Sequence, residues 1–221
     1  MKLFRFLMVA ALAIVTSASV QAGALTGVVL SNLGTDGITG TSAISQNVNG
    51  SARGAFSFTV GASDFTLDAM NIYGFGDSSS TVTGTLSLFA DNSGNPASIN
   101  PVNALYSATN TNMTGDGHYT FDFANPTLTA GTTYWVVLTT SGVTSSWYLK
   151  NGAPASYAPG GITYGTAKET TTSGASWNSL SPFAPLFAIS GSPTPAAVPE
   201  PALTSLLCLS GIALIRRRMK K

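Results

Sequence analysis

Short apolar runs that alternate with polar residues constrain the fold of this chain more than any other feature. Residues 56–60 and 81–90 alternate cleanly, and Tyr119, Phe121 and Phe123 lie on one face of a third run. A period of two residues is typical of β-strands, because successive side chains of a strand point to opposite faces. No stretch of about 12 residues outside the two ends combines the helical period with capping residues. We therefore expect an all-β fold.

Further apolar runs and the turns between them extend this expectation. The additional runs are 67–75, 132–140, 147–149 and 186–189. The run at 132–140 is apolar on both faces, which is typical of a central strand. Clusters rich in Gly, Asn, Asp and Ser separate the runs at 74–80, 91–96, 115–117 and 130–131. Many short strands joined by such turns indicate a β-sandwich, and we expect one of jelly-roll-like kind.

The charge of the central part excludes one class of function. Residues 23–198 contain three basic residues, Arg53, Lys150 and Lys168, against eight acidic ones, although the whole chain has a formal charge of +1. A nucleic-acid binder needs clustered Lys or Arg for phosphate contacts, so we expect no nucleic-acid partner. Charged residues are only 9% of the chain and hydrophobic ones 44%, which argues for a folded domain rather than a disordered one.

The N-terminal segment has the layout of a secretory signal peptide. Lys2 and Arg5 precede an apolar run at 6–15, and small residues then occupy the positions that a signal peptidase reads. We predict a signal peptide over 1–22, cleavage after Ala22, and export across the inner membrane. The alternative is an N-terminal membrane anchor, for which the apolar run is short.

The C-terminal end combines a proline-rich stem, an uncharged apolar segment and a basic cluster. We expect a stem over 191–197, an apolar transmembrane helix over 202–215 and a basic tail over 216–221. As a helix, 14 residues reach about 21 Å, less than the hydrocarbon core of about 30 Å. The positive-inside rule keeps the basic tail in the cytoplasm, and its cations help so short a helix to span by snorkelling. The alternative is a buried C-terminal helix of the domain.

Val198-Pro199-Glu200-Pro201, the apolar segment and the arginine cluster follow one another over 198–221. This combination resembles the PEP-CTERM protein-sorting signal of Gram-negative bacteria. The sorting motif would consist of Pro199, Glu200 and Pro201, and the basic stop of Arg216, Arg217 and Arg218. The resemblance implies processing near the Pro-Glu-Pro motif by an exosortase, a membrane-embedded cysteine transpeptidase. The protein would be membrane-anchored only transiently and would end at the cell surface or in the extracellular matrix. These residues would form a substrate motif, so none of them would be catalytic.

The central part resembles the bacterial surface domain called choice-of-anchor R. The resemblance follows the order of several segments over most of 50–190, and we assign the secreted domain to 23–190. Its most specific part is Leu128-Thr129-Ala130-Gly131-Thr132-Thr133-Tyr134-Trp135. Domains of this type are joined to alternative C-terminal anchoring signals. The resemblance implies a fold and a surface location, and it implies no biochemical activity.

Residues that could support catalysis are few. His118, the only histidine, follows Gly115-Asp116-Gly117 without a Gly-x-Ser-x-Gly motif, and we expect it to be a solvated turn residue. Cys208, the only cysteine, lies in the tail, which removes a cysteine nucleophile and any intrachain disulfide. Two aspartate pairs leave a cryptic hydrolase as an alternative: Asp64 with Asp68, and Asp116 with Asp122. We expect turn-forming aspartates, no enzymatic activity and no cofactor.

Two features leave binding alternatives open. Residues 91–95 offer oxygen ligands for Ca²⁺ but lack the EF-hand spacing and its final glutamate, so we expect a tight hairpin turn and no metal site. Tyr157, Tyr164 and Trp177 lie in Gly- and Pro-rich surroundings. They could stack on sugar rings, which would make the protein a carbohydrate-binding module of the exopolysaccharide matrix. They could equally close the open end of the two sheets.

Overall fold

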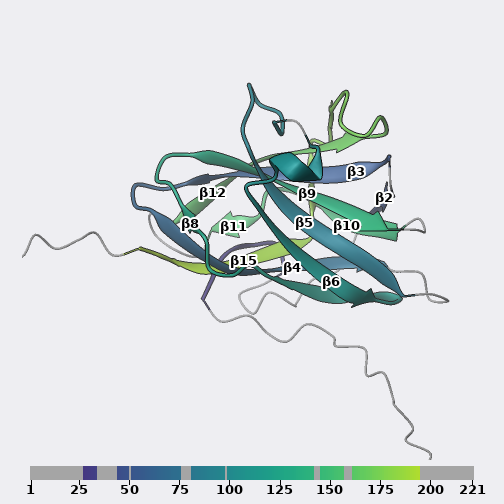
Figure 1. Cartoon of the computed structure of the whole chain (residues 1–221), viewed down its shortest axis with the longest axis horizontal. Coiled ribbons are helices and arrows are strands. Elements are labelled where there is room, and N and C mark those ends of the chain that lie inside the picture. Colours follow the sequence, from purple (N-terminus) through teal and green to yellow (C-terminus); the bar gives the residue numbers. More distant parts are fainter. Residues whose placement is uncertain are drawn as a thin grey trace, which may run out of the picture.

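The computed structural model describes residues 27–33, 44–49, 51–75, 81–97, 99–141, 145–156 and 161–194. These residues form two antiparallel sheets that lie over one another (Figure 1). Within these ranges, the one helical element is the short 3-10 turn η1 (Pro101–Asn103). The all-β prediction is confirmed, and the arrangement is consistent with a β-sandwich.

The first sheet, sheet A, has nine strands and is organised around β4 (Phe65–Phe75). On one side β4 pairs with β15 (Phe187–Pro193) and with β10 (Ser145–Asn151). On its other side β4 pairs with β7 (Asp116–Asp122) and β8 (Thr127–Leu128). The sheet is extended by β1 (Val28–Ser31) on β15, by β11 (Ala155–Ser156) on β1, and by β2 (Ile44–Val48) and β14 (Phe183–Pro185) on β10.

The second sheet, sheet B, has six strands. Their order is β13 (Asn178–Ser179), β12 (Ile162–Thr170), β3 (Arg53–Val60), β9 (Thr133–Ser141), β5 (Val82–Ala90) and β6 (Tyr106–Met113). The turn at Thr114 and Gly115 leads from β6 in sheet B to β7 in sheet A. The central strand β9 is buried on both faces, as the sequence predicts.

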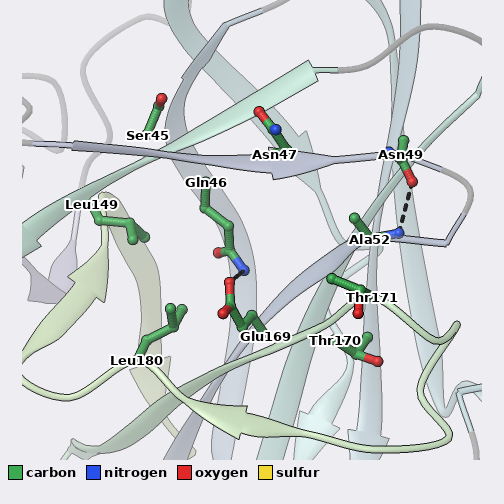
Figure 2. A pocket seen from close by; sticks show the side chains of 10 residues that line it. All are labelled: Ser45, Gln46, Asn47, Asn49, Ala52, Leu149, Glu169, Thr170, Thr171 and Leu180. Atoms are coloured by element: carbon green, nitrogen blue, oxygen red, sulfur yellow. Dashed lines mark hydrogen bonds between the residues drawn. The ribbon is translucent and has the colours of Figure 1, made fainter.

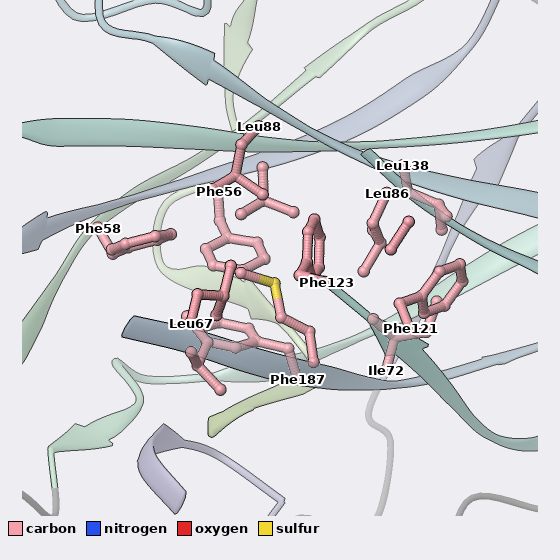
Figure 3. Close-up of a cluster of buried hydrophobic side chains, with 14 of the residues drawn as sticks. Phe56, Phe58, Leu67, Ile72, Leu86, Leu88, Phe121, Phe123, Leu138 and Phe187 are labelled. Atoms are coloured by element: carbon pink, nitrogen blue, oxygen red, sulfur yellow. The ribbon is translucent and has the colours of Figure 1, made fainter. Parts of the chain in front are cut away.

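The core lies between the two sheets and is rich in aromatic rings. Phe56 of β3 stacks on Phe187 of β15, with ring centroids 3.8 Å apart, and thereby joins sheet B to sheet A. Figure 3 shows these two rings surrounded by other buried side chains, among them Leu67, Leu88 and Phe123. Full burial of one such side chain stabilises a fold by about 1.5–3 kcal/mol. This core has to hold the sheets together without a disulfide, because the chain has a single cysteine.

The structure describes the start of the segment that the sequence assigns to the stem. The last strand, β15, continues through Pro193, so it extends three residues into the segment assigned to the stem. The predicted signal peptide with Ala22 and the predicted sorting signal over 198–221 lie outside the described residues. In the part of the chain that the structure describes, no helix has the length and hydropathy of a membrane span.

Candidate functional site

A pocket of about 550 Å³ lies where β2 of sheet A faces β3 and β12 of sheet B (Figure 2). We call it the Gln46 pocket. It is lined by Ser45, Gln46, Asn47, Asn49, Ala52, Leu149, Glu169, Thr170, Thr171 and Leu180. Small-ligand pockets occupy about 300–1,000 Å³, so its volume is that of a binding site.

Gln46 and Glu169 form the polar centre of this pocket. Strand alternation exposes Ser45 and Asn47 and turns Gln46 inward, toward Glu169 of β12 (Figure 2). Gln46 is 6% exposed, and its Nε2 donates a hydrogen bond to Glu169 Oε2 at 3.3 Å. Its Oε1 is buried and has no hydrogen-bond partner in the described part of the chain. A buried acceptor in this state destabilises a fold by about 1–3 kcal/mol.

Gly54 of β3 makes room for the Gln46 amide. A Cβ at Gly54 would lie 2.7 Å from Gln46 Oε1 and 3.1 Å from Trp147 Cε3. Gly54 is the cross-strand neighbour of Glu169, which places both residues directly opposite Gln46. Trp147 is held in place by the hydrogen bond from its Nε1 to the Leu186 carbonyl oxygen at 3.0 Å. The inner wall of the pocket therefore consists of strand residues in fixed positions.

Two other polar side chains around the Gln46 pocket form hydrogen bonds with the backbone. Asn49 Oδ1 accepts hydrogen bonds from the backbone N–H groups of Ser51 at 2.9 Å and Ala52 at 2.7 Å. Thr170 Oγ1 accepts from the N–H groups of Thr172 at 3.2 Å and Gly174 at 3.1 Å. These bonds stabilise two turns. Ser45, Asn47 and Thr171 also line the pocket, and the Gln46–Glu169 pair lies beside Leu149 and Leu180 (Figure 2).

His118 lies in strand β7 and is half-buried, so its assignment as a solvated turn residue is wrong. It is the cross-strand partner of Tyr73, and the two rings are 4.7 Å apart. Tyr73 in turn packs against Tyr148 at 5.1 Å, and the Tyr148 hydroxyl donates to Asp116 Oδ1 at 2.8 Å. Burial, followed by this hydrogen bond and the charge of Asp116, raises the pKa of Tyr148 to about 12. His118 is thus part of a row of rings on sheet A.

Asp116 and Asp122 do not have the geometry of a glycosidase pair. Asp116 and Asp122 are the first and last residues of β7. Six residue steps along a strand span about 20 Å, whereas paired catalytic carboxylates are about 5–9.5 Å apart. Asp64 Oδ1 accepts the backbone N–H of Ala130 at 2.9 Å, and Asp68 is an exposed residue of β4. Among the described residues, no group of three or more His, Cys, Asp or Glu side chains could hold a metal ion.

The 91–95 segment forms the tight hairpin turn that its sequence predicts. Asn92 and Asn95 exchange backbone hydrogen bonds of 2.8 and 3.2 Å, and Gly94 has φ +79°. The Asp91 carboxylate accepts from Trp135 Nε1 at 2.7 Å. Lys168 Nζ donates to Asn95 Oδ1 at 2.7 Å and lies 5.5 Å from the centre of the Trp135 ring. The side-chain oxygens of Asp91 and Asn95 therefore accept hydrogen bonds from Trp135 and Lys168.

The late aromatic residues are not brought together. Tyr164 of β12 packs toward the core, with its ring 6.3 Å from that of Phe187, and burial raises the pKa of its hydroxyl. It lines a separate pocket of about 280 Å³. Trp177 packs against a different cluster, which contains Phe89 and Trp135. These two side chains do not form one sugar-stacking platform, and Tyr157 lies outside the described residues.

Comparison with models of protein families and with curated proteins gives no match for this chain. Sequence reasoning missed Gln46, Gly54 and Glu169. The one signal for Gln46 was its place between two polar neighbours in a short run, which does not tell an inward residue from an outward one.

Proposed function

We propose that this protein is a non-enzymatic, secreted protein of the cell surface or extracellular matrix. It is exported by a signal peptide over 1–22, and an exosortase processes it through the PEP-CTERM-like tail. Its body is a β-sandwich of jelly-roll-like kind. The observation that carries the proposal is the combination of Pro199-Glu200-Pro201, an uncharged segment and a terminal basic cluster in that order. The two-sheet body supports it, because a stable all-β domain is a suitable cargo for export without disulfides.

The tail gives this sorting signal a physical basis. Cations at 216–221 remain on the cytoplasmic side and fix the depth of the apolar helix, which places Glu200 near the outer interface. The prolines of the stem keep the backbone extended, so that a membrane enzyme can reach it. The backbone N–H of Thr194 still bonds to the Asp64 carbonyl oxygen at 2.7 Å. Five residues span at most about 17 Å even when extended, so cleavage near the Pro-Glu-Pro motif would take place close to the folded body.

Replacement of Pro199, Glu200 and Pro201 by alanine in the native host tests the proposal. We expect a precursor that keeps its tail and remains in the membrane fraction, detected by intact mass and by fractionation. Pro195→Ala is the matched control, because it removes a stem proline and leaves the motif intact, and it should mature normally. An unchanged mature mass and location in the triple variant would refute the sorting role.

A further inference from the structure

We propose that a second pocket, on the outer face of sheet B, binds the carboxylate group of an organic acid through Arg53. We call it the Arg53 pocket. Its volume is about 290 Å³, close to the lower end of the range for small-ligand sites. The proposal concerns the folded body, so it is independent of the sorting role of 198–221.

The register of sheet B brings four hydroxyl groups to this face. Thr85 of β5 lies opposite Thr139 of β9, and Ser87 of β5 lies opposite Ser107 of β6. Side chains two residues apart on a strand point to the same face, so Thr85 and Ser87 lie on one side of the sheet. Leu86, between them, belongs to the core. The hydroxyl groups therefore lie on the outer face, where all four residues line the pocket.

The polar groups of the Arg53 pocket are open to solvent. Ser107 is exposed, and Arg53, Thr85 and Thr139 are half-buried. Val137 is 1% exposed and forms part of the floor beneath them. A ligand can therefore reach the guanidinium and hydroxyl groups without any movement of the core.

Arg53 is anchored at the edge of the pocket. Its Nη1 donates a hydrogen bond to the Ile99 carbonyl oxygen at 3.2 Å, which ties the side chain to the segment between β5 and β6. A guanidinium group has five N–H donors in a planar fork, so this bond uses one of them. Burial lowers the pKa of Arg53, although a guanidinium stays charged at ordinary pH. A cation partly withdrawn from water gains more from an anion than an exposed cation does.

The hydroxyl groups beside Arg53 can add further donors. Ser87 Oγ and Ser107 Oγ are 2.9 Å apart, so one of them donates to the other. Each hydroxyl carries one proton, and the mutual bond uses only one of the two. The other proton can point to a ligand oxygen, and Ser107 is the exposed member of the pair. Thr85 and Thr109 repeat this arrangement with their Oγ1 atoms 3.2 Å apart.

Charge and shape select a carboxylate among anions. Arg53 is the only charged residue among the described residues that line the pocket. One cation balances one negative charge, whereas a dianion such as sulfate would keep a second charge without a partner and would lose more hydration. The two oxygens of a carboxylate also lie in one plane and match the planar fork of an arginine. We expect the order of affinity to be carboxylate, sulfate, neutral molecule.

NMR titration of the purified full chain tests the proposal with galacturonate, galactose and inorganic sulfate. Galacturonate and galactose differ only in a carboxylate against a hydroxymethyl group. Galacturonate should shift the backbone amide resonances of Thr85, Ser107 and Thr139 in a saturable way, sulfate should bind more weakly, and galactose should leave them unchanged. Trigalacturonate distinguishes the sources of the carboxylate. Tighter binding than that of galacturonate would identify an acidic polysaccharide, and weaker binding a free acid.

Arg53→Gln should weaken galacturonate binding by about tenfold or more, because it removes a charge-assisted hydrogen bond. Lys150→Gln is the matched control, since it removes the same charge from an exposed position of β10 in sheet A and should leave the affinity unchanged. Ser107→Ala keeps Arg53 and changes only an exposed side chain, so it should fold normally. It should weaken binding by about threefold, which keeps the test decisive if Arg53→Gln does not fold.

Equal losses in Arg53→Gln and Lys150→Gln would indicate general charge attraction and overturn the proposal. A response to galactose equal to that of galacturonate, tighter binding of sulfate, or shifts confined to residues outside the pocket would also overturn it. An absence of saturable shifts with both galacturonate and trigalacturonate would have the same consequence. These readouts do not depend on maturation of the tail, so a failure here is distinct from a failure of the sorting proposal.

Discussion

Gly191 and Gly54 mark two regions of the body that are both crowded but differ in what crowds them. A Cβ at Gly191 of β15 would overlap the backbone carbonyl oxygen of Thr66 and would lie 2.6 Å from Phe65 Cζ. A Cβ at Gly54 would meet the amide end of the Gln46 side chain. The β4–β15 junction is thus closed by backbone and a core ring, whereas the Gln46 pocket is bounded in part by a side chain. Only the second kind of boundary can yield by the movement of a side chain.

The largest expected effect of a substitution is at the first region. Gly191→Ala should lower the free energy of unfolding by about 3 kcal/mol or more, because overpacking costs about 1–3 kcal/mol and a non-glycine residue at positive φ adds strain of similar size. Gly191 has φ +157°. Urea unfolding of the purified protein measures the change. A midpoint within experimental error of the wild type would show that the β4–β15 junction can yield. The proposed difference between the Gly191 and Gly54 regions would then be wrong.

A smaller effect is expected at the second region. Gly54→Ala should destabilise by about 1–2 kcal/mol, since it crowds both Gln46 and the Trp147 ring. The same substitution in a Gln46→Ala background should cost less, because the shortened side chain no longer fills the space. Urea unfolding of the four proteins of this double-mutant cycle should give a coupling of about 0.5–1.5 kcal/mol. Additive changes would indicate that Trp147 alone limits the site.

The smallest expected effect concerns a third region, the outer face of sheet A, where Tyr148 meets Asp116. The pKa of Tyr148 is raised to about 12 by burial and by Asp116. A raised pKa means that the folded state holds this proton longer than the unfolded state, so the contribution to stability is present below about pH 10 and is lost as the pH rises toward 12. Asp116→Asn should shift the tyrosinate absorbance change to lower pH, with Tyr148→Phe identifying the signal. An unshifted titration would remove Asp116 as a cause.

The sequence predicts the strands whose environment follows a simple rule. β9 is buried on both faces, β7 alternates in burial, and the apolar residues of β3 and β5 largely recur at every second position, so hydrophobicity along the chain identifies these strands. It does not predict β6 and β12. β6 pairs only with β5 in the described part of sheet B and exposes five of its eight residues, so it needs few apolar ones. β12 contains a register shift between Tyr164 and Ala167, which breaks the alternation.

The candidate site could not be predicted because it depends on contacts between distant segments. Gln46 and Glu169 are 123 residues apart in the sequence and meet only when β2 and β12 face each other across the two sheets. Gly54 could not be singled out from the sequence, because its role depends on the Gln46 side chain that lies against it. The error at His118 has a local cause. Of the three residues read as a turn, Gly115 has φ +66° and belongs to it, whereas β7 already begins at Asp116.

The position of β15 has a mechanical consequence for a protein held by its C-terminal end. This strand is the last before the tail, and it is paired along one side with β1 and along the other with β4. Drag on a tethered molecule would pull β15 along its own axis, parallel to both neighbours. The hydrogen bonds of two ladders would then share the load at once instead of opening one after another. Attachment through the C-terminal tail, as proposed, would therefore load the domain at a place where it resists shear.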